Sequence, residues 1–358
     1  MKTYTKRTET KAIMVGNVQI GRQNKIIIQS MTNTPTKNID ATVAQIHDLE
    51  KVGCEIVRVA VTDFEDAEAI SKIIERVSIP VVADIHFDHR LALAALKNGV
   101  NKIRLNPGNI ANQDHVKEVV HLCKSHQIPI RIGINSGSLP KHLLDKYKAP
   151  CPQAMIEAAD EHIAILKSLD FDDIVLSFKS SDVMLTIQVY RLAAQKYDYP
   201  LHIGVTEAGT KFHSAIKSSA ALGALIADGI GDTIRISISG DPIDEIVVAK
   251  QLLRSFDLID NVINLVSCPT CGRLAYDMLP IVNEVEKFIT SLKSNITVAV
   301  MGCAVNGPQE ASRADIGIAG GKNEALLFKK GKLIKKVPQD QLLSELKKEI
   351  LSMIENEA

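Results

Sequence analysis

The chain has 358 residues, of which 46% are hydrophobic and 4% aromatic, and its 42 Lys and Arg residues balance 42 Asp and Glu residues. Because the net charge is zero, the molecule has no overall field that would attract nucleic acid or an anionic membrane surface. Any charged partner must therefore be held by a local cluster of residues. The composition differs from that of a disordered chain, and the length fits one large domain and a smaller one.

The N-terminal segment lacks the apolar stretch of a secretory signal, and no run approaches the roughly 18 apolar residues of a membrane-spanning helix. The sequence therefore predicts a cytoplasmic protein with neither a membrane nor a nucleic acid as its partner. Six cysteines are too few for a disulfide scaffold, and in a reducing compartment they stay available for metal or redox chemistry. We interpret the scattered Cys54, Cys123 and Cys151 as packing residues.

Eight short runs rich in β-branched residues recur in the first two thirds of the chain and predict strands. They are Ile26–Met31, Ile56–Val61, Val81–Ile85, Lys102–Leu105, Ile130–Ile134, Ile174–Phe178, Leu201–Val205 and Thr233–Ile238. Helical spacing marks the stretches between them, such as Ala41–Val52, Arg90–Gly99, Gln113–His126, Met155–Leu169 and Val183–Lys196. Eight strand–helix units in about 250 residues predict an α/β fold of the TIM (β/α)8 barrel type. The alternative is an open doubly wound sheet, but no G-x-G-x-x-G follows the first strand.

Two further segments complete the predicted organisation. Ile13–Ile20, with Gly16-Asn17 at its centre, predicts a hairpin that could plug the barrel floor. After a helix at Ile243–Phe256 the pattern changes, beginning with a Cys pair. It continues with a helix at Leu274–Leu292, a strand at Ile296–Met301, a Gly-rich stretch at Gly302–Gly321, a hairpin around Lys330–Lys332 and a last helix at Gln341–Asn356. We therefore predict a substrate-binding barrel domain over residues 1–260 and a small α+β domain over 261–358.

Five predicted strands carry a cation in similar surroundings. These residues are Arg58 in V-R-V-A, Arg104 in I-R-L-N, Arg131 in I-R-I-G, Lys179 in S-F-K-S and Arg235 in I-R-I-S. Because side chains alternate across a strand, Arg104 shares a face with Lys102 and Asn106, opposite Ile103 and Leu105. The apolar faces suit packing against the helices, which places the cations inside the barrel.

These cations have two interpretations. One is a set of buried ion pairs with Asp84, Glu207 or Asp232. Five cations outnumber those carboxylates, so we favour a phosphate or diphosphate bound by guanidinium groups at the barrel mouth. Gly-rich and polar loops after the strands add further donors. The predicted substrate-binding residues are Arg58, Asp84, His86, Arg104, Arg131, Asn135, Lys179 and Arg235, at the strand ends where barrel enzymes keep their active sites.

Glu207 is a candidate catalytic residue. It follows a predicted inner strand and lies beside the cations, where a carboxylate can orient a hydroxyl or move a proton. A direct role and a structural one are equal alternatives for it. For His86 and His202 the alternative to a role in the site is a hydrogen-bonded place in the core.

A metal site is the strongest local signal. Cys268-Pro-Thr-Cys271 puts two thiolates in one turn, and Cys303 follows 32 residues after Cys271. This region has no fourth Cys and no His, which favours a [4Fe–4S] cluster with one iron open to a carboxylate, a water or a substrate. Glu310 lies across a Gly-Pro turn and is a candidate for that iron. The alternative is a structural zinc site closed by water or Glu310.

These residues resemble the 4-hydroxy-3-methylbut-2-en-1-yl diphosphate synthase family of the methylerythritol phosphate route to isoprenoids. The matching stretches span both predicted domains in the family's order and the compact bacterial length. They are I-Q-S-M-T-N-T, R-L-N-P-G-N, R-I-G-I-N-S-G-S-L, L-S-F-K-S-S, G-V-T-E-A-G, I-R-I-S-I-S-G-D-P, C-P-T-C-G-R and M-G-C-A-V-N-G-P. One departure is Gln309, where we expect the family to have Gly, and it puts the local backbone turn in question.

The resemblance implies that Cys268, Cys271, Cys303 and Glu310 bind a [4Fe–4S] cluster and that Arg58, Arg104, Arg131 and Lys179 bind substrate. It implies reductive opening of 2-C-methyl-D-erythritol 2,4-cyclodiphosphate to 4-hydroxy-3-methylbut-2-enyl diphosphate with loss of water. Flavodoxin or ferredoxin would supply the two electrons. We hypothesise that the leaving hydroxyl displaces Glu310 and that Glu207 orients it or relays protons.

The chain length between the domains also predicts a homodimer. The eighth helix runs away from the barrel mouth, and the ten residues Asp257–Val266 span at most about 33 Å. Each cluster domain is therefore expected to cap the partner's barrel, in agreement with the resemblance.

Two other functions stay open: a phosphosugar or pterin-type barrel lyase with a structural metal domain, and an iron-responsive binding protein.

Overall fold

The computed structural model describes residues 7–85, 88–110, 112–321 and 323–356. The chain divides into two compact units, residues 1–252 and 253–358. Within the described ranges, no helix is both long and apolar enough to cross a membrane. The predicted domain limits, 1–260 and 261–358, stay a prediction, because a division of contacts does not show which part binds substrate or a cluster.

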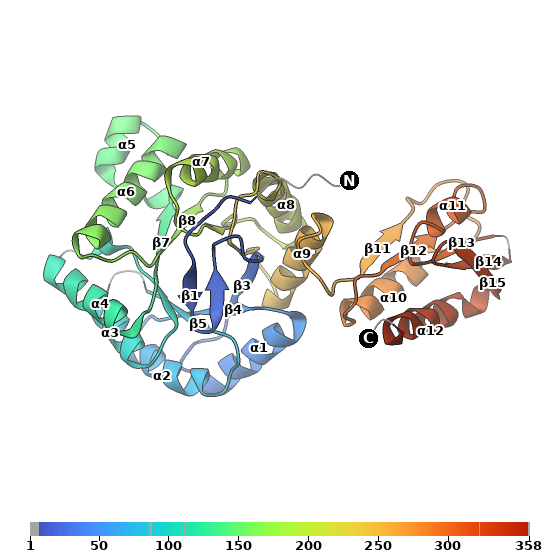
Figure 1. Cartoon of the computed structure of the whole chain (residues 1–358), viewed down its shortest axis with the longest axis horizontal. Coiled ribbons are helices and arrows are strands. Elements are labelled where there is room, and N and C mark those ends of the chain that lie inside the picture. Colours follow the sequence, from blue (N-terminus) through green and yellow to red (C-terminus); the bar gives the residue numbers. More distant parts are fainter. Residues whose placement is uncertain (1–6, 86–87, 111, 322, 357–358) are drawn as a thin grey trace. The chain divides into compact units, whose positions relative to one another are not determined.

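The first unit is a parallel barrel, which confirms the predicted fold class (Figure 1). Its strands are β3 (Ile27–Met31), β4 (Ile56–Ala60), β5 (Val81–Asp84), β6 (Lys102–Arg104), β7 (Ile130–Asn135), β8 (Ile174–Lys179), β9 (His202–Ile203) and β10 (Thr233–Ile234). They pair in the order β8-β7-β6-β5-β4-β3-β10-β9. A parallel bridge between Leu176 and Leu201 brings the two ends of this sheet together.

The last two barrel strands are shorter than predicted. Beyond β9 and β10 the described residues form separate hydrogen bonds, among them those from Arg235 N–H to Ile203 C=O (3.0 Å) and from Thr206 N–H to Ser180 C=O (3.1 Å). Gly204 explains the irregularity, since a Cβ there would lie 2.7 Å from the carbonyl oxygen of Arg235. The close approach of the two backbones replaces a regular ladder.

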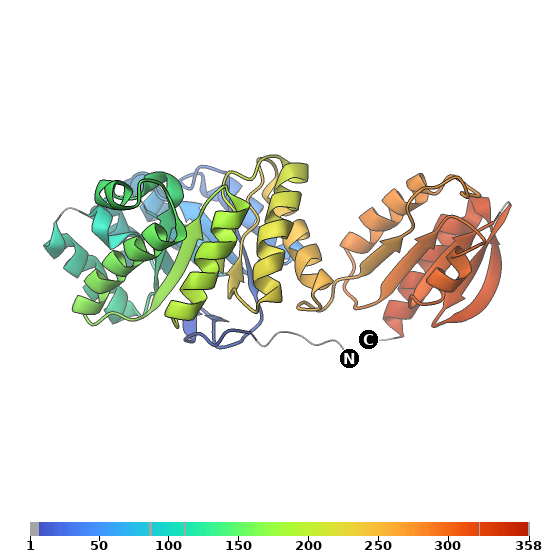
Figure 2. The ribbon, with the colours of Figure 1, turned by 90° about the horizontal axis from the view of Figure 1, so that it is seen from above.

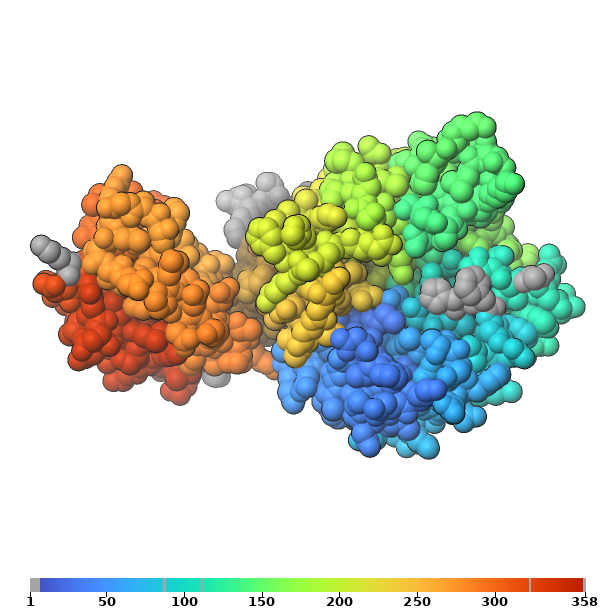
Figure 3. All heavy atoms as spheres, turned by 180° about the vertical axis from the view of Figure 1, so that it is seen from behind, coloured from blue at the N-terminus to red at the C-terminus, as the bar shows by residue number. Residues whose placement is uncertain are grey.

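Helices alternate with the strands and form a ring around them (Figures 1 and 2). They are α1 (Ile39–Val52), α2 (Phe64–Ile74), α3 (His89–Lys97), α4 (Gln113–His126), α5 (Lys141–Tyr147), α6 (Pro152–Ser168), α7 (Val183–Lys196), α8 (Lys211–Ala227) and α9 (Pro242–Ser255). Several begin at an Asn or Asp that accepts a hydrogen bond from the first turn: Asn38, Asp63, Asp88, Asn112 and Asp182. In the space-filling view the barrel's colours run from blue through cyan and green to yellow around its circumference, as this order requires (Figure 3).

The predicted hairpin precedes the barrel. Its strands are β1 (Ile13–Val15) and β2 (Val18–Ile20), which pair antiparallel. Three of its side chains, Ile13, Val15 and Ile20, form one buried cluster with residues at the amino ends of the barrel strands, among them Ile27 and Ile56. The hairpin thus closes the floor of the barrel with apolar surface, and the polar groups are left to the other end.

The second unit is an α/β layer with a mixed sheet. Its elements are β11 (Asn264–Ser267), α10 (Leu279–Thr290), β12 (Thr297–Met301), α11 (Gly307–Ala311), β13 (Ile316–Gly320), β14 (Glu324–Lys329), β15 (Lys332–Pro338) and α12 (Leu342–Glu355). The strands follow the order β11-β12-β13-β14-β15, parallel as far as β13 and antiparallel after it. A cluster of buried residues from the sheet, α10 and α12 forms its core.

One predicted element of this unit begins later than expected. The helix predicted over Leu274–Leu292 starts at Leu279, with Pro280 in its first turn, a favoured position for proline. The preceding residues are held by other contacts, since the N–H of Ala275 donates to the carbonyl of Gly302 (2.8 Å). The sequence pattern showed helical spacing here but not this competing contact.

Candidate active site and metal-binding residues

The inward-facing side chains of the barrel strands carry several charges. The strand register places Asp84 on β5 opposite Arg104 on β6, and Arg104 opposite Arg131 on β7. Arg58 on β4 lies opposite Met31 on β3. Residues that face one another across neighbouring strands project from the same face of a sheet. All four charged side chains are buried, so they lie inside the barrel.

Asp84 is a carboxylate that two of these arginines share. Its Oδ2 lies 3.6 Å from Nε of Arg58, and its Oδ1 lies 3.6 Å from Nη1 of Arg104. Burial, together with the charges of Arg235 and Arg104, lowers the pKa of the Arg58 guanidinium to about 10, while Asp84 acts in the opposite direction. One buried carboxylate thus holds two guanidinium groups near each other and compensates only one of their two charges.

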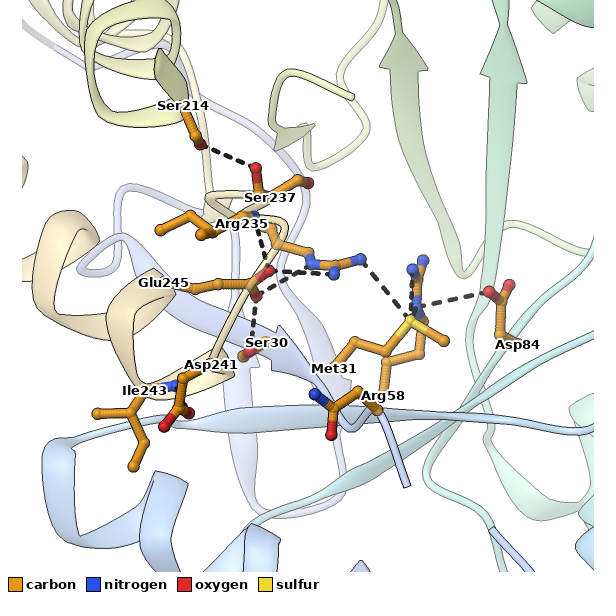
Figure 4. Close-up of polar contacts among 12 residues, drawn as sticks. Ser30, Met31, Arg58, Asp84, Ser214, Arg235, Ser237, Asp241, Ile243 and Glu245 are labelled. Carbon is orange, nitrogen blue, oxygen red and sulfur yellow. Dashed lines mark hydrogen bonds and ion pairs between the residues drawn. The ribbon is translucent and has the colours of Figure 1, made fainter. Parts of the chain in front are cut away.

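Glu245, in the first turn of α9, is a second buried carboxylate, and it positions Arg235 (Figure 4). Its Oε1 lies 3.3 Å from Nη2 of Arg235. Its carboxylate also accepts hydrogen bonds from the Ser30 hydroxyl (2.7 Å) and from the backbone N–H of Ile238 (3.1 Å). The first barrel strand, the last one and the helix after it are therefore joined by a single carboxylate. The sequence interpretation missed this residue.

The sulfur of Met31 lies between Arg58 and Arg235 (Figure 4). It is 2.9 Å from Nη2 of Arg58 and 3.7 Å from Nη1 of Arg235. A thioether is only a weak acceptor, so it neutralises neither cation. The two positive groups are therefore gathered at one place with a single neutral atom between them.

Arg131 has no such partner. Its side chain is 0% exposed, and none of its three guanidinium nitrogens has a hydrogen-bond partner in the described part of the chain. Burial and then the charge of Arg58 lower the pKa of Arg131 well below its ordinary value. Buried charges are normally paired. An unpaired guanidinium inside a cationic barrel is suited to an anion that enters from outside.

A cavity of about 200 Å³ opens beside these groups. Arg58, Lys179 and Arg235 line it, together with the hydroxyl-bearing residues Ser177 and Thr206. Burial and then the charge of Arg58 lower the pKa of Lys179 to about 6. The cavity therefore gathers cationic and hydroxyl groups, which suit the oxygens of an anion.

His202 also lines this cavity but has a place in the core. Its Nδ1 forms a hydrogen bond with the Thr233 hydroxyl (2.7 Å). Burial, followed by the charge of Arg131, lowers the pKa of the His202 imidazole well below its ordinary value. The ring is therefore neutral, and the core interpretation of this histidine is the one that its contacts favour.

A second cavity, of about 320 Å³, lies among the loops after β6 and β7. Arg104 and Asn135 line it, as does His162 from α6. The Nδ1 of His162 accepts a hydrogen bond from the N–H of Gly108 (2.9 Å). A Cβ on Gly108 would lie 2.7 Å from Cε1 of this ring, so the N-P-G-N loop needs glycine at this point. The loop is thereby fixed beside Arg104.

The remaining predicted barrel residues have other positions. His86 lies outside the described residues. Glu207 is exposed in the loop after β9 and adopts the left-handed conformation, with φ of 53°. Asp232, considered above as a partner for the strand cations, instead pairs with Arg7 (3.3 Å) and accepts a hydrogen bond from Thr10. Within the described part of the chain, Asp84 is the one of these three carboxylates that pairs with the strand cations.

Two of the three clustered cysteines follow neighbouring parallel strands of the second unit's sheet. Cys268 follows β11 directly, and Cys303 comes two residues after β12, the parallel neighbour of β11. The N–H of Gly302 donates to the sulfur of Cys268 (3.2 Å). Among the residues that the structure describes, however, no three His, Cys, Asp or Glu side chains stand close enough to hold a metal ion. The ligand set therefore stays a prediction.

The chemistry of these residues nevertheless fits an iron–sulfur cluster. The backbone N–H groups of Val305, Asn306 and Gly307 lower the pKa of the Cys303 thiol, so they favour its thiolate. Thiolates with backbone N–H donors are the usual environment of such a cluster. Glu310 is exposed on α11. Gln309 is a regular residue of the same helix, so the chain does not need glycine there.

The other cysteines behave differently. Cys54 and Cys123 are buried and Cys151 is half-buried at the start of α6. Burial raises the pKa of Cys54 to about 12 and raises that of Cys123 as well. A buried thiol of this kind is inert, in agreement with a packing role.

Two protein-family models match the chain. One, described as the GcpE TIM-barrel domain, matches residues 10–250, and the other, described as the GcpE protein C-terminal domain, matches residues 264–352. Together they cover both units.

Similar proteins extend over the whole chain. A relative from Anoxybacillus flavithermus, named 4-hydroxy-3-methylbut-2-en-1-yl diphosphate synthase (flavodoxin), is 53% identical over 358 residues, which are 100% of this chain and 98% of the relative. A protein of the same name from Bacillus cytotoxicus is 55% identical over 350 residues, 98% of this chain and 95% of the relative. Among solved structures, Yersinia pestis DHPS with a pterine–sulfa conjugate has a TM-score of 0.50 at 10% identity, covering 69% of this chain and 100% of that one. At that identity the likeness shows the barrel fold alone.

Proposed function

The chain belongs to the GcpE family of 4-hydroxy-3-methylbut-2-en-1-yl diphosphate synthases, and from this premise we propose how its residues carry out the reaction. The enzyme is an iron–sulfur oxidoreductase of the methylerythritol phosphate pathway that takes electrons from flavodoxin. It opens the ring of 2-C-methyl-D-erythritol 2,4-cyclodiphosphate. A carbon–oxygen bond to phosphate breaks, a hydroxyl leaves as water, and two electrons form the double bond of the product.

The observation that carries the substrate assignment is the excess of buried cations over carboxylates inside the barrel. Arg58 and Arg104 share one carboxylate, Arg131 has none among the described residues, and Lys179 adds a further amine. A diphosphate supplies the negative charges that this set lacks, and guanidinium groups suit phosphate oxygens as bidentate donors.

The barrel residues have separate tasks in this proposal. Arg131, Arg58 and Lys179 bind the diphosphate, and Arg235 adds a fourth donor from the last strand. Asp84 and Glu245 do not touch the anion but fix the guanidinium planes that do. Arg104 and Asn135 line the neighbouring cavity and extend the binding surface, and His86 joins the set because of its place in the sequence, directly after a predicted barrel strand. Fixed donors of this kind cost little reorganisation when the charge of the ligand changes.

Ring opening itself adds negative charge to the ligand, because the bridging phosphate oxygen becomes a terminal one. The buried cations therefore stabilise the opened diphosphate more than the closed ring. Binding energy that increases along the reaction accelerates it, whereas equal binding of both states would not.

We assign proton transfer to Glu207. Glu207 lies in the loop after β9 and directly follows Thr206, which lines the cavity. An exposed carboxylate at this point can exchange protons with solvent and with the leaving hydroxyl once substrate is bound. In the second unit we assign Cys268, Cys271 and Cys303, with Glu310 as the exchangeable ligand, to a [4Fe–4S] cluster. Such a cluster supplies electrons one at a time.

We further propose that the enzyme is a homodimer in which each cluster domain serves the partner's barrel. The short connection between the eighth barrel helix and Cys268 supports this proposal, as argued from the sequence. Flavodoxin is the electron donor, ferredoxin is the alternative, and the cytoplasm is the proposed location.

Co-expression of two inactive variants tests the dimer. Arg131→Met removes a barrel residue and Cys271→Ser removes a cluster ligand, on otherwise identical chains. If cluster and barrel act between chains, random pairing restores about a quarter of the sites, one in each mixed dimer. No recovery, with mixed dimers shown to form, would contradict the proposal.

The function itself is tested with anaerobically purified protein. We expect a brown protein that contains iron and converts the cyclodiphosphate when reduced flavodoxin is supplied. A colourless, zinc-bearing protein would favour a barrel lyase, and a brown protein without conversion would favour an iron-responsive binding protein.

A further inference from the structure

Lys102 is a buried cation that the proposed reaction does not use. It begins β6, two residues before Arg104, and its register partner is Val82 on β5. Because side chains alternate along a strand, Lys102 points into the barrel as Arg104 does, one step nearer the apolar floor. Its side chain is 0% exposed.

No acceptor in the described residues takes a hydrogen bond from the Nζ of Lys102. The titratable and charged groups that surround it come from each neighbouring inner strand and from α9. Arg131, Arg58 and His202 are the ones in electrostatic contact with it, and Asp84, Arg104, Lys179, Arg235 and Glu245 are the others inside the same barrel. The two carboxylates of this set are already paired with arginines.

These surroundings disfavour the charged form of Lys102. Burial, followed by the charges of Arg131 and Arg58, lowers the pKa of the Lys102 ammonium well below its ordinary value. A fully buried lysine without a partner, beside other positive charges, is disfavoured in its charged form. In the ligand-free barrel the uncharged amine is therefore the favoured form at neutral pH.

The bound substrate brings negative charge to Lys102, opposite in sign to the charge of the arginines. Each phosphate of the cyclodiphosphate is bonded twice through oxygen, so it has a single acidic oxygen and keeps its negative charge across the neutral range. A nearby negative charge raises the pKa of an amine, whereas the arginines lower it. A dianion bound to Arg131 and Arg58 compensates the two charges that act most strongly on Lys102.

We propose that Lys102 is a neutral amine in the ligand-free barrel and becomes an ammonium ion when the cyclodiphosphate binds, taking one proton from solvent. This inference rests on the proposed function and adds a positioning residue to it. The amine avoids the cost of a permanent buried charge, and it supplies an additional positive charge when the anion is present. One N–H bond forms, the buffered solvent that donates the proton loses its own bond to it, and no other bond changes.

Proton uptake has a measurable consequence for affinity. Where the free amine is neutral and the bound one is charged, the dissociation constant rises tenfold per pH unit for each proton taken up. Lys179, whose pKa is lowered to about 6, is also expected to take up a proton when the anion binds. A variant at Lys102 separates the two, because Lys179 is present in both proteins.

The test is isothermal titration calorimetry of the full-length, cluster-loaded, oxidised enzyme with the cyclodiphosphate, without reductant so that no turnover occurs. Titration at pH 8 in two buffers of different ionisation enthalpy gives the number of protons taken up. We expect the wild type to take up about one proton more per bound ligand than Lys102→Met. We also expect the two affinities to converge as pH rises, since the amine then stays neutral in both states.

Controls make each outcome decisive. Lys97→Met changes an exposed lysine at the end of α3 and should leave proton uptake at the wild-type value. Lys102→Gln is a second neutral variant and must agree with Lys102→Met. Equal uptake by the wild type and both Lys102 variants overturns this inference alone. A wild type that does not bind the cyclodiphosphate overturns the proposed function and this inference with it.

Discussion

The carboxylate of Glu245 lies 3.3 Å from Nη2 of Arg235, inside the barrel and 3% exposed. The same carboxylate accepts the Ser30 hydroxyl from the first barrel strand. A guanidinium at the mouth of the barrel is therefore held by a helix that begins after the last strand. This relationship makes Glu245 a positioning residue for the anion rather than a ligand of it.

Replacement of Glu245 by Gln should weaken substrate binding more than it slows the reaction. The amide keeps the size but leaves the charge of Arg235 without its partner, and loss of one buried partner costs about 1–3 kcal/mol. We expect KM for the cyclodiphosphate to rise about tenfold, with kcat changed much less. Steady-state kinetics and chemical denaturation measure the two effects.

The matched control is Asp244→Asn, one residue earlier on α9. Asp244 pairs with Lys211 at the surface (2.7 Å), where an ion pair contributes at most about 1 kcal/mol. It should leave KM unchanged. If both variants gave the same KM as the wild type, Glu245 would have a structural role only.

The stability of the ligand-free enzyme should rise with pH because of Lys179. Its pKa is about 6 in the folded barrel and about 10.5 in the unfolded chain, so between these values the unfolded chain binds one more proton. Protonation thus favours unfolding, and stability is lost as pH falls through this window, by at most about 1.4 kcal/mol per pH unit.

Thermal unfolding of Lys179→Met between pH 6.5 and pH 9 checks this sign. The melting temperature of the wild type should increase more steeply with pH than that of the variant. The cyclodiphosphate should reduce the difference, because a bound anion favours the charged lysine. Parallel curves in the absence of ligand would show that Lys179 is charged at neutral pH.

Glu207→Gln separates proton transfer from binding. If Glu207 relays protons or orients the leaving hydroxyl, turnover should fall at least about tenfold. Affinity for the cyclodiphosphate and the visible spectrum should stay at wild-type values. Glu65→Gln, at an exposed glutamate that pairs with Lys37, is the control for a lost surface carboxylate. Full activity of Glu207→Gln would remove this residue from the mechanism.

The cysteines should divide into two groups. Cys271→Ser should lose iron and visible absorption, because a hydroxyl is a poor substitute for a thiolate at iron. Cys151→Ser should keep both and gain as much as about 1 kcal/mol in stability, since a serine at this N-cap position, just before α6, can cap the helix where Cys151 makes no such bond. Iron analysis and thermal unfolding of both variants measure these effects. Loss of iron from Cys151→Ser would contradict the division.

Strand periodicity predicted much of this site. Arg104 and Arg131 follow the two-residue alternation, so their inward direction was readable from the isoleucines beside them. The pairing of Asp84 with Arg58 and Arg104 depends on strand neighbours, which follow from the barrel order. The barrel class itself followed from eight strand–helix units, and the hairpin from Gly16-Asn17.

Other features depend on packing that no local pattern shows. Glu245 is one of several acidic residues at the start of α9, and only the packed barrel shows that it reaches Arg235. Glu207 adopts a left-handed conformation that is rare for glutamate and has no sequence signal. The late start of α10 results from the hydrogen bond between Ala275 and Gly302. These two residues lie on opposite sides of α10 in the sequence, so no local pattern shows their contact.

The most direct test of the whole account is a stoichiometric anaerobic reaction followed by phosphorus NMR. The reconstituted enzyme is mixed with one equivalent of 2-C-methyl-D-erythritol 2,4-cyclodiphosphate and with reduced flavodoxin in measured amounts. We predict that the cyclic diphosphate signals are replaced by those of a linear diphosphate, with two electrons consumed per molecule converted. Persistence of the cyclic signals, with the cluster intact and the flavodoxin reduced, would contradict the account.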